Sequence, residues 1–359
     1  MKILFTGGGT GGHIFPIIAI KESFQDAHKF YYLGPDSFAK ENLKDIKTKF
    51  IAAGKFKRYF DPLLSIELTK TIIGIIQSFW YLFFWMPDVI FSKGGYGSFP
   101  VVFVGRLYRI PIIVHDSDAI PGITNRKTAR WAKKIILSFE SAKKYFKPKQ
   151  QNKIVIIGNP IRKELLIGEK NSAKQALNIA SAKPVILIMG SSQGAQKINE
   201  IVVNTLPRLL EIAEIIHMTG EKNFKDVKKE TQKSPEYHLY PFLNAEQLKN
   251  AYAVTDLIIN RAGAGSIFEI AALGKPGILI PLENSASNHQ KQNAYEFGQT
   301  GGAVVLGQEN LTPNIFLETV SNLLKNPQKL SEMSAKARTF YNPQTPELIR
   351  DEIMKFAKS

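Results

Sequence analysis

The chain has 359 residues, of which 44% are hydrophobic and 22% are charged, so it has enough apolar material for packed cores and is neither disordered nor fibrous. At roughly 150 residues per domain, this length predicts two domains. Cysteine is absent, which excludes disulfides, thiolate zinc sites and cysteine nucleophiles. The N-terminus runs directly into a short apolar stretch and a glycine loop, so we predict no export signal.

The positive charge is concentrated in the first half of the chain. The formal net charge is +16, and residues 1–160 hold 24 Lys and Arg against 11 Asp and Glu, a balance of +13. Residues 161–359 hold 23 against 20, a balance of +3. A half with this charge attracts an anionic surface, either nucleic acid or a layer of phospholipid headgroups.

Short apolar runs alternate with longer amphipathic stretches along the whole chain. We predict strands at 2–5, 30–33, 89–92, 112–115, 135–138 and 154–157, and a second series at 185–189, 215–218, 257–260, 277–280 and 303–305. Helical patterns lie between most of them. Alternating strands and helices, with strands rich in Val, Ile and Leu, indicate buried parallel sheets.

The series of strands restarts near residue 185, which predicts an α/β protein with two doubly wound, Rossmann-like domains. We expect an N-terminal domain over residues 1–160 and a C-terminal domain over residues 161–341, joined near Gly158. The last helix, within residues 342–359, could belong to either domain, and we expect it to pack back on the first.

An unusually apolar segment lies at residues 72–86, where Gln77 and Ser78 are the clearly polar residues. As a helix this segment is about 22 Å long, too short for the ~30 Å hydrocarbon core of a membrane. Its aromatic residues cover more than one helix face, whereas a helix on a soluble protein normally keeps one face polar. A basic and aromatic cluster lies just upstream at residues 55–60. The simplest interpretation of this segment is an ordinary buried helix. We favour instead a helix that docks on a membrane surface.

Three glycine loops follow predicted strands, at residues 7–12, 94–97 and 190–195. Glycine lets a backbone approach a ligand closely, and a helix that begins after the loop directs free N–H groups at an anion. Open α/β sheets bind ligands beyond the carboxyl ends of their strands, which is where these loops are predicted to lie. A dinucleotide site would also need an acidic residue after the second strand, where Asp36 is the sole candidate.

Two polar groups in the second half suit a nucleotide sugar. Glu269 is predicted in the first turn of a helix that follows a strand, where a carboxylate can accept two ribose hydroxyls. Its simpler role is a favourable charge at a helix N-terminus. Gln290 opens an amide-rich helix and could bind sugar hydroxyls, although single residues of this kind are often solvated.

Taken in order, these motifs resemble the family of peptidoglycan N-acetylglucosaminyltransferases that make lipid II. The matching stretches are GGTGGHIFP (8–16), KGGYGSFP (93–100), GITNR (122–126), GNPIR (158–162), GSSQGA (190–195), HMTG (217–220), NRAGAGSIFEIAALGKP (260–276) and NHQKQNA (288–294). The resemblance implies the glycosyltransferase B fold, two domains facing a cleft. It implies a nucleotide sugar on the C-terminal domain and a membrane-bound lipid acceptor on the N-terminal domain.

The resemblance also implies which residues bind the substrates. On the donor, UDP-GlcNAc, Arg162 and Ser192 belong near the diphosphate, Glu269 at the ribose and Gln290 at the GlcNAc hydroxyls. Further donor contacts are implied for the uracil end and for the first domain's side of the cleft: Leu243, Ala264, Gly265 and Ser266, and Thr10, Gly11, Gly12 and Asn125. The acceptor side is implied to include Gly94, Gly95, Tyr96 and His115.

The sequence departs from the family pattern before the GITNR motif. The family commonly has His-Glu-x-Asn there, whereas this chain has His115 followed by Asp116, Ser117 and Asp118. Asp-x-Asp is also the metal-binding motif of the other major glycosyltransferase fold, in which a divalent cation neutralises the leaving diphosphate. Because the triplet lies in the N-terminal half, we instead expect no metal and no cofactor, with a helix N-terminus and Arg162 neutralising the diphosphate.

The implied reaction is a single displacement at the anomeric carbon of GlcNAc, in which UDP leaves and the 4-hydroxyl of MurNAc in lipid I attacks from the opposite face. The hydroxyl needs a general base, and His13, at the end of the first glycine loop, is our candidate. A histidine that only positions the loop or the diphosphate is the alternative.

Four other functions compete with the implied transferase activity. A transferase acting on another lipid, such as diacylglycerol, would lack the KGGYGSFP and GITNR stretches. A UDP-GlcNAc epimerase needs additional carboxylates, a nucleic-acid-binding protein needs a recognisable module, and an oxidoreductase needs the ribose-binding acid. We therefore expect UDP-GlcNAc, lipid I and an anionic phospholipid surface as partners, with cell-wall synthesis proteins possible and no nucleic acid. The expected location is peripheral, on the cytoplasmic face of the bacterial cell membrane.

Overall fold

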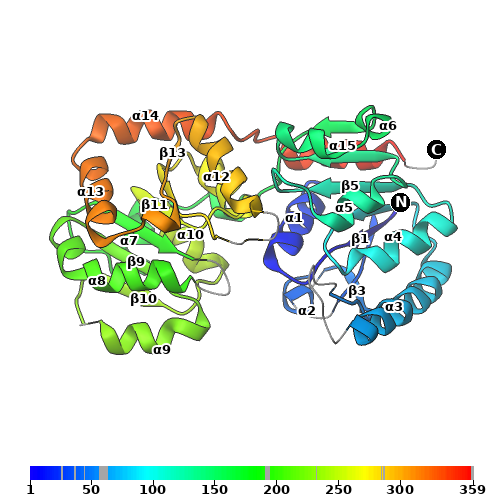
Figure 1. Ribbon diagram of the computed structural model, residues 1–359, viewed down its shortest axis with the longest axis horizontal. Coiled ribbons are helices and arrows are strands. Elements are labelled where there is room, and N and C mark those ends of the chain that lie inside the picture. Colours follow the sequence, from blue (N-terminus) through cyan, green and yellow to red (C-terminus); the bar gives the residue numbers. More distant parts are fainter. Residues whose placement is uncertain are drawn as a thin grey trace. The chain divides into compact units, whose positions relative to one another are not determined.

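The computed structural model describes residues 1–25, 27–35, 38–43, 45–55, 64–190, 195–231, 233–283, 285 and 288–356. The chain divides into two compact units (Figure 1). Unit 1 comprises Met1–Ile161 and Pro343–Ser359, and unit 2 comprises Arg162–Asn342. The predicted boundary at 160/161 lies one residue before the observed one.

Unit 1 is a parallel sheet with helices on both faces. Its strands are β1 (Lys2–Thr6), β2 (Lys29–Gly34), β3 (Lys47–Phe50), β4 (Val89–Ser92), β5 (Ile112–Asp116), β6 (Lys134–Leu137) and β7 (Ile154–Ile156). Its helices are α1 (Gly11–Glu22), α2 (Phe38–Asn42), α3 (Leu64–Trp85), α4 (Ser98–Leu107), α5 (Ile123–Thr128), the 3-10 helix η1 (Glu140–Tyr145), α6 (Pro148–Gln151) and α15 (Thr345–Met354). In the described residues the strand order is β3-β2-β1-β4-β5-β6-β7.

Alternate residues of these strands enter two different cores. Ile3 and Phe5 of β1 pack with the buried side chains of α1 and α15, whereas Leu4 packs with those of α3 and α4. Successive side chains of a strand point to opposite faces, so a strand buried on both sides needs apolar residues throughout. The near-continuous apolar runs in the sequence have this cause.

The last helix, α15, belongs to unit 1 although it follows unit 2 in the sequence (Figure 1). Ile349 and Ile353 are fully buried in the core that α1 also enters. The Thr345 hydroxyl donates to the carbonyl of Ile157 (3.1 Å), and an Arg350 Nη donates to the carbonyl of Ser23 (2.9 Å). The chain end therefore stabilises the N-terminal unit.

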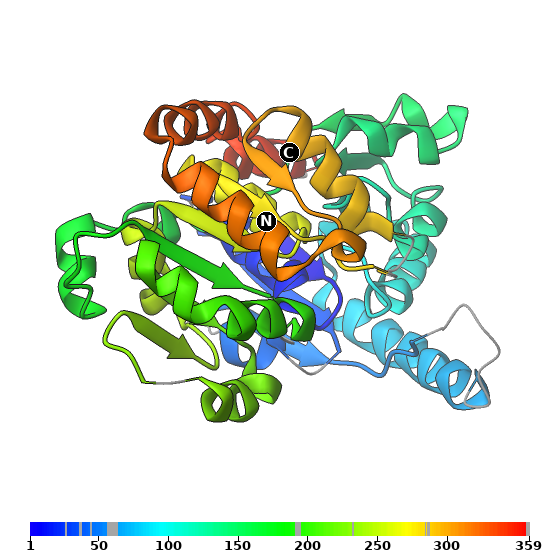
Figure 2. The ribbon, with the colours of Figure 1, turned by 60° about the vertical axis from the view of Figure 1, so that its left-hand side comes forward.

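Helix α3 lies at the periphery of unit 1 (light blue in Figure 2) and turns its small residues inward. Its buried positions are Thr71, Gly74, Ser78, Leu82 and Trp85. A Cβ at Gly74 would collide with the carbonyl oxygen of Ala52, so glycine is needed for this close approach. The helix ends at Trp85, one residue before the end of the apolar segment 72–86, and it begins at Leu64, eight residues before that segment.

Unit 2 repeats the architecture. Its strands are β8 (Val185–Met189), β9 (Glu214–Met218), β10 (Tyr237–Tyr240), β11 (Leu257–Asn260), β12 (Gly277–Leu279) and β13 (Ala303–Val305). Its helices are η2 (Lys163–Leu166), α7 (Lys170–Ala176), α8 (Gln196–Ile212), α9 (Glu221–Glu230), α10 (Ala245–Val254), α11 (Ala264–Leu273), α12 (His289–Gln299), η4 (Gln308–Asn310), α13 (Pro313–Leu324) and α14 (Pro327–Arg338). The strand order is β10-β9-β8-β11-β12-β13, and all pairs are parallel.

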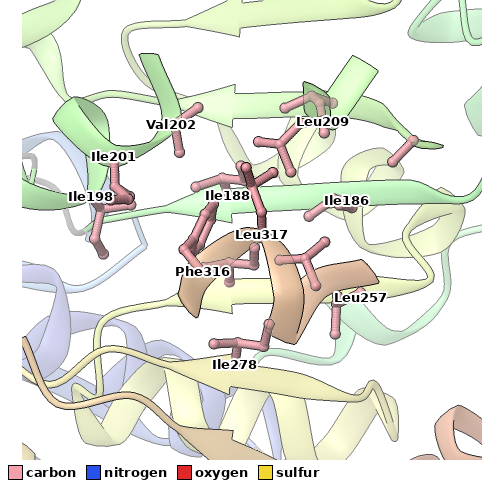
Figure 3. Close-up of a cluster of buried hydrophobic side chains, with 14 of the residues drawn as sticks. Ile186, Ile188, Ile198, Ile201, Val202, Leu209, Leu257, Ile278, Phe316 and Leu317 are labelled. Carbon is pink, nitrogen blue, oxygen red and sulfur yellow. The ribbon is translucent and has the colours of Figure 1, made fainter. Parts of the chain in front are cut away.

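Helices α8 and α13 cover one face of this sheet. Figure 3 shows Ile198 and Val202 of α8 and Phe316 of α13 directed at strand residues such as Ile188, and all four are fully buried. Spacings of three and four residues along α8 place its apolar side chains on one stripe. The prediction of two doubly wound domains is confirmed.

Candidate functional site

The glycine loops of unit 1 lie at one edge of its sheet. They follow β1 and β4, and a further turn follows β5; these three strands are neighbours in the order β1-β4-β5. In a parallel sheet the carboxyl ends of neighbouring strands meet at the same edge, which is where open α/β folds bind ligands. Gly94 and Gly95 both have positive φ, +85° and +81°, which a residue with a side chain rarely adopts.

His13 is enclosed by two of these glycine loops. A Cβ placed on Gly8 would lie 2.9 Å from its ring, and one on Gly95 would lie 2.9 Å from Nε2. Nδ1 is 2.9 Å from the hydroxyl of Thr10, the residue before α1. When Nδ1–H donates to Thr10, the lone pair of Nε2 is left to accept a proton. Thr10, Gly11, Gly12, His13 and Gly95 are thus brought together.

The imidazole of His13 is held in its neutral form. Desolvation by the surrounding protein and, to a smaller extent, the charge of Lys93 lower its pKa to about 4, while Asp118 opposes the shift. At neutral pH the ring can therefore accept a proton. A bound anion would raise this pKa, since a nearby negative charge favours the protonated form of a histidine. The low starting pKa therefore suits a site that will hold an anion.

Asn125 is buried beside Gly94 and organises the turn after β5. Its amide nitrogen donates to the carbonyl of His115 (3.0 Å) and to Oδ2 of Asp116 (2.8 Å). Its Oδ1 is buried and has no hydrogen-bond partner in the described structure. A Cβ on Gly94 would overlap the Asn125 amide, so the two loops can lie this close only because residue 94 is glycine. The unsatisfied oxygen is a candidate ligand contact.

Asp116 has a structural role in the same turn. Its carboxylate accepts from the backbone N–H groups of Asp118 (3.0 Å) and Gly122 (3.0 Å) as well as from Asn125. Burial and the charge of Asp118 raise its pKa to about 6, and these hydrogen bonds oppose the shift. Within the described residues, no group of three His, Asp or Glu side chains is placed to hold a metal ion.

The implied acceptor-side position of His115 needs correction. Its side chain is fully buried, and Nε2 lies 3.0 Å from the carbonyl of Gly158 and 3.3 Å from the hydroxyl of Ser138. His115 is the fourth residue of a strand covered on both faces, and the alternation of that strand directs its ring into the core beside Phe91. His115 therefore fixes the end of the strand and offers no surface to a ligand. Tyr96, in contrast, is partly exposed.

A polar network that was not predicted from the sequence lies beneath these loops. Lys93, directly after β4, is 3% exposed, and its ammonium group donates to Oδ1 of Asn159 (3.0 Å) and to the hydroxyl of Ser117. The Ser117 hydroxyl donates to the same Asn159 oxygen at 2.7 Å. A lysine between a buried strand and two glycines was the available signal, because a charge is rarely buried without partners.

In unit 2, Glu269 lies beside Arg162 and Tyr252. The Tyr252 hydroxyl donates to Oε2 of Glu269 at 2.7 Å. Burial raises the pKa of Glu269, while the Tyr252 hydrogen bond and the charge of Arg162 oppose the shift. Arg162 is 6% exposed, and its Nη1 lies 2.9 Å from Oε1 of Glu164. Tyr252, in α10, was not predicted, since a lone tyrosine in an amphipathic helix carries no signal of its own.

The predicted place of Glu269 in its helix was wrong. Helix α11 begins at Ala264, and its first turn contains no acidic residue, so Glu269 lies in the second turn. Its interaction with the helix dipole is therefore weak, since that effect is confined to the first turn. The simpler explanation, a charge that stabilises the helix N-terminus, loses its support.

The N-terminus of α11 is open. A Cβ at Gly263 or Gly265 would meet no atom within 4 Å, so there is free space beside the start of the helix. Ala264 is buried, and Gly265 and Ser266 are partly exposed. A ligand with an anionic or carbonyl oxygen could bind there.

The structure gives less support to three other residues that were predicted to contact the donor. The side chain of Leu243 is 2% exposed and packs inside unit 2. Gln290, in the first turn of α12, accepts through Oε1 from the backbone N–H of Leu282 at 3.0 Å, and its amide nitrogen remains available for a ligand. Ser192 lies outside the described residues.

A large apolar surface is exposed on α3. We call Ile72, Ile76, Phe79, Trp80, Phe83 and Phe84 the outer face of α3; these side chains are between 49% and 65% exposed. Among the described helices, α3 included, none has the length and apolar content of a membrane-spanning segment.

Comparison with known proteins identifies relatives over nearly the full chain. Residues 3–137 match the glycosyltransferase family 28 N-terminal domain, and residues 185–347 match its C-terminal domain. A relative from Clostridioides difficile (strain 630) is 34% identical, covering 100% of this chain and 90% of its own length. One from Bacillus anthracis is 39% identical, covering 90% and 92%. Both are named UDP-N-acetylglucosamine--N-acetylmuramyl-(pentapeptide) pyrophosphoryl-undecaprenol N-acetylglucosamine transferase.

Solved structures share the architecture. The crystal structure of Acinetobacter baumannii MurG has a TM-score of 0.76 and 27% identity over 99% of both chains. A UDP-GlcNAc 2-epimerase from Neisseria meningitidis, bound to UDP-GlcNAc, has a TM-score of 0.72 but 15% identity, over 99% of this chain and 100% of its own. The second similarity concerns the fold alone.

Proposed function

Since the chain belongs to the family of UDP-N-acetylglucosamine–N-acetylmuramyl-(pentapeptide) pyrophosphoryl-undecaprenol N-acetylglucosamine transferases, we propose that it transfers GlcNAc from UDP-GlcNAc to lipid I. The acceptor atom is the 4-hydroxyl of MurNAc in undecaprenyl-pyrophosphoryl-MurNAc-pentapeptide, and the product is lipid II. Similarity over the full length to relatives named for this acceptor carries the proposal. It also disfavours the alternative of diacylglycerol.

The reaction is a single displacement that inverts the anomeric centre. The MurNAc hydroxyl oxygen attacks the anomeric carbon, the α bond to the diphosphate breaks with its electron pair leaving on UDP, and a β1–4 bond forms. The hydroxyl proton goes to Nε2 of His13. The neutral state of that ring and its contact with Thr10 through the other nitrogen support this role.

Unit 2 binds the donor in this proposal. Glu269 accepts the ribose hydroxyls, and Tyr252 holds its carboxylate in place. Arg162 and Ser192 contact the diphosphate, the N-terminus of α11 (Ala264, Gly265 and Ser266) and Leu243 frame the uracil, and Gln290 binds GlcNAc hydroxyls. A guanidinium and helix N–H groups can neutralise a leaving diphosphate without a metal ion.

Unit 1 binds the acceptor and meets the membrane. Gly94, Gly95 and Tyr96 contact lipid I, and Thr10, Gly11, Gly12 and Asn125 contribute to the donor from this side. The outer face of α3 and the +13 balance of residues 1–160 support docking on anionic phospholipid. The proposed location is peripheral, on the cytoplasmic face of the membrane. Cell-wall synthesis proteins are further candidate partners.

The test is transfer with purified protein. We expect UDP release and a product heavier by one GlcNAc when UDP-GlcNAc is incubated with a short-chain lipid I analogue, and neither with diacylglycerol. EDTA should leave the rate unchanged. His13→Ala should abolish most transfer with donor binding intact. Binding of UDP-GlcNAc without transfer to lipid I would contradict the proposed acceptor.

A further inference from the structure

Lys93 lies where three loops of unit 1 converge. It follows β4, its backbone N–H donates to the carbonyl of Thr6 at the end of β1 (2.8 Å), and its ammonium group donates to Ser117, after β5, and Asn159, after β7. Both side-chain acceptors are neutral oxygens. The positive charge is therefore fixed in position by hydrogen bonds beneath the glycine loops.

Lys93 and His13 flank the same glycine of the first loop. A Cβ on Gly7 would be 3.3 Å from the Cβ of His13 and 3.4 Å from the Cβ of Lys93, so the two side chains start on either side of one glycine. A cation that cannot move away disfavours a second positive charge in its neighbourhood.

We propose that Lys93 is a positioning residue of this site: its buried ammonium group holds the loops after β5 and β7 together beside His13, and its charge adds to the burial that disfavours a proton on that ring. The inference rests on the proposed role of His13 as the base. Lys93 itself touches no substrate, because it is almost completely buried.

The neighbouring charges agree in sign with this role. Burial is the main cause of the lowered pKa of both His13 and His115, the charge of Lys93 acts in the same direction on both, and Asp118 opposes the shift of His13. Burial lowers the pKa of Lys93 to about 7, and Asp116 and Asp118 oppose that shift. Lys93 therefore keeps its proton below about pH 7, which covers the range in which His13 would take up its own.

The direct test is an NMR titration of the His13 ring, assigned with His13→Gln, in the full-length protein. In the wild type we expect the ring to remain neutral down to pH 5, and a midpoint near the ordinary value for histidine would overturn the proposal. In Lys93→Met the midpoint should rise by about half a pH unit or more. Lys149→Met, which removes an exposed lysine of α6, should leave it unchanged.

Two further variants separate charge from folding. Lys93→Gln can still donate to Asn159, so it tests the loss of charge if the methionine variant does not fold, and its midpoint should also rise. Lys93→Arg keeps the charge and should keep the low midpoint. A purely structural lysine would change the melting temperature in all three variants with the midpoint unmoved, and that result would overturn the proposal.

Kinetics then distinguish this inference from the proposed function. In Lys93→Met the acid limb of kcat/KM should move to higher pH together with the NMR midpoint. If the midpoint moves while the acid limb stays, the charge effect of Lys93 stands and the base role of His13 fails. If the wild type transfers no GlcNAc, the proposed function fails, and the titration still decides whether Lys93 controls the charge of His13.

Discussion

At the scale of single residues, the carboxylate of Glu269 is the donor contact with the best-defined surroundings. Tyr252 donates to one of its oxygens, and its position beyond the first turn of α11 leaves it no strong role in stabilising the helix. Burial of a carboxylate is costly without partners, so a ligand hydroxyl pair at this point would complete its hydrogen bonds.

We therefore expect Glu269→Ala to raise the Kd for UDP-GlcNAc by about tenfold to a hundredfold, the loss typical of hydrogen bonds to a charged group. Tyr252→Phe should raise it less, since it leaves the carboxylate in place. Titration calorimetry with UDP-GlcNAc measures the effect, and Glu246→Ala, on the exposed side of α10, is the matched control. Equal binding by Glu269→Ala and the control would contradict the ribose role.

His217 has a different use, although it lies in one of the family motifs. It is fully buried, with Nδ1 2.9 Å from the Tyr237 hydroxyl and Nε2 3.1 Å from Oδ1 of Asn199. Burial lowers its pKa to about 3. It stabilises β9 against its neighbours and offers nothing to a substrate.

This burial predicts a pH dependence of stability. Between pH 6.5 and about 3 the unfolded chain binds a proton at His217 that the folded chain does not. As the pH is lowered through this range, the free energy of unfolding therefore decreases by about 1.4 kcal/mol per pH unit. Urea unfolding of the wild type and His217→Gln should therefore differ less at pH 5 than at pH 7, by roughly 2 kcal/mol. A constant difference would show that His217 titrates normally in the folded protein.

At the scale of elements, the strands were predicted to within one residue except for two. The missed strands, β3 and β10, are the edge strands at one end of each sheet. Lys47–Phe50 alternates exposed and partly buried residues, and in Tyr237–Tyr240 only the first residue is buried. These two edge strands are less covered and their sequences lack a continuous apolar run, whereas the opposite edges, β7 and β13, have one and were predicted.

The parts of the site in which the backbone conformation requires glycine could be predicted from the sequence. The contacts between side chains from different loops could not. The glycine loops were predicted from the sequence because positive φ and close approach leave few other choices. The burial of His115 depends on the register of its strand, and the Lys93 network joins three loops far apart in sequence. Neither follows from local spacing.

The outer face of α3 gives the clearest prediction for an element. Phe79→Ser and Trp80→Ser together should reduce co-sedimentation with vesicles containing anionic phospholipid by about tenfold or more, since each removes a large exposed apolar side chain. The melting temperature should stay within a few degrees of the wild type. Ser substitution at exposed Leu107 is a matched control. Unchanged sedimentation would exclude this face as the membrane contact.

At the scale of the whole molecule, both ends of the chain belong to the same unit. The chain passes from unit 1 to unit 2 after Ile161 and returns to unit 1 with α15. Each unit has its own hydrophobic core: two buried clusters form within Met1–Ile161 and α15, and another forms within Arg162–Asn342. The two units should therefore differ in their response to changes in α15.

Ile349→Ala or Ile353→Ala should destabilise unit 1 by about 2–5 kcal/mol, because each removes a fully buried side chain from the core shared with α1. Leu348→Ala, on the exposed side of the same helix, should cost far less. Hydrogen exchange resolves the units: amides of β1 and β5 should lose protection, while those of β8 and β11 keep it. UDP-GlcNAc affinity should persist if unit 2 alone supplies the main donor contacts. Equal loss of protection in both sheets would mean that the two units unfold as one.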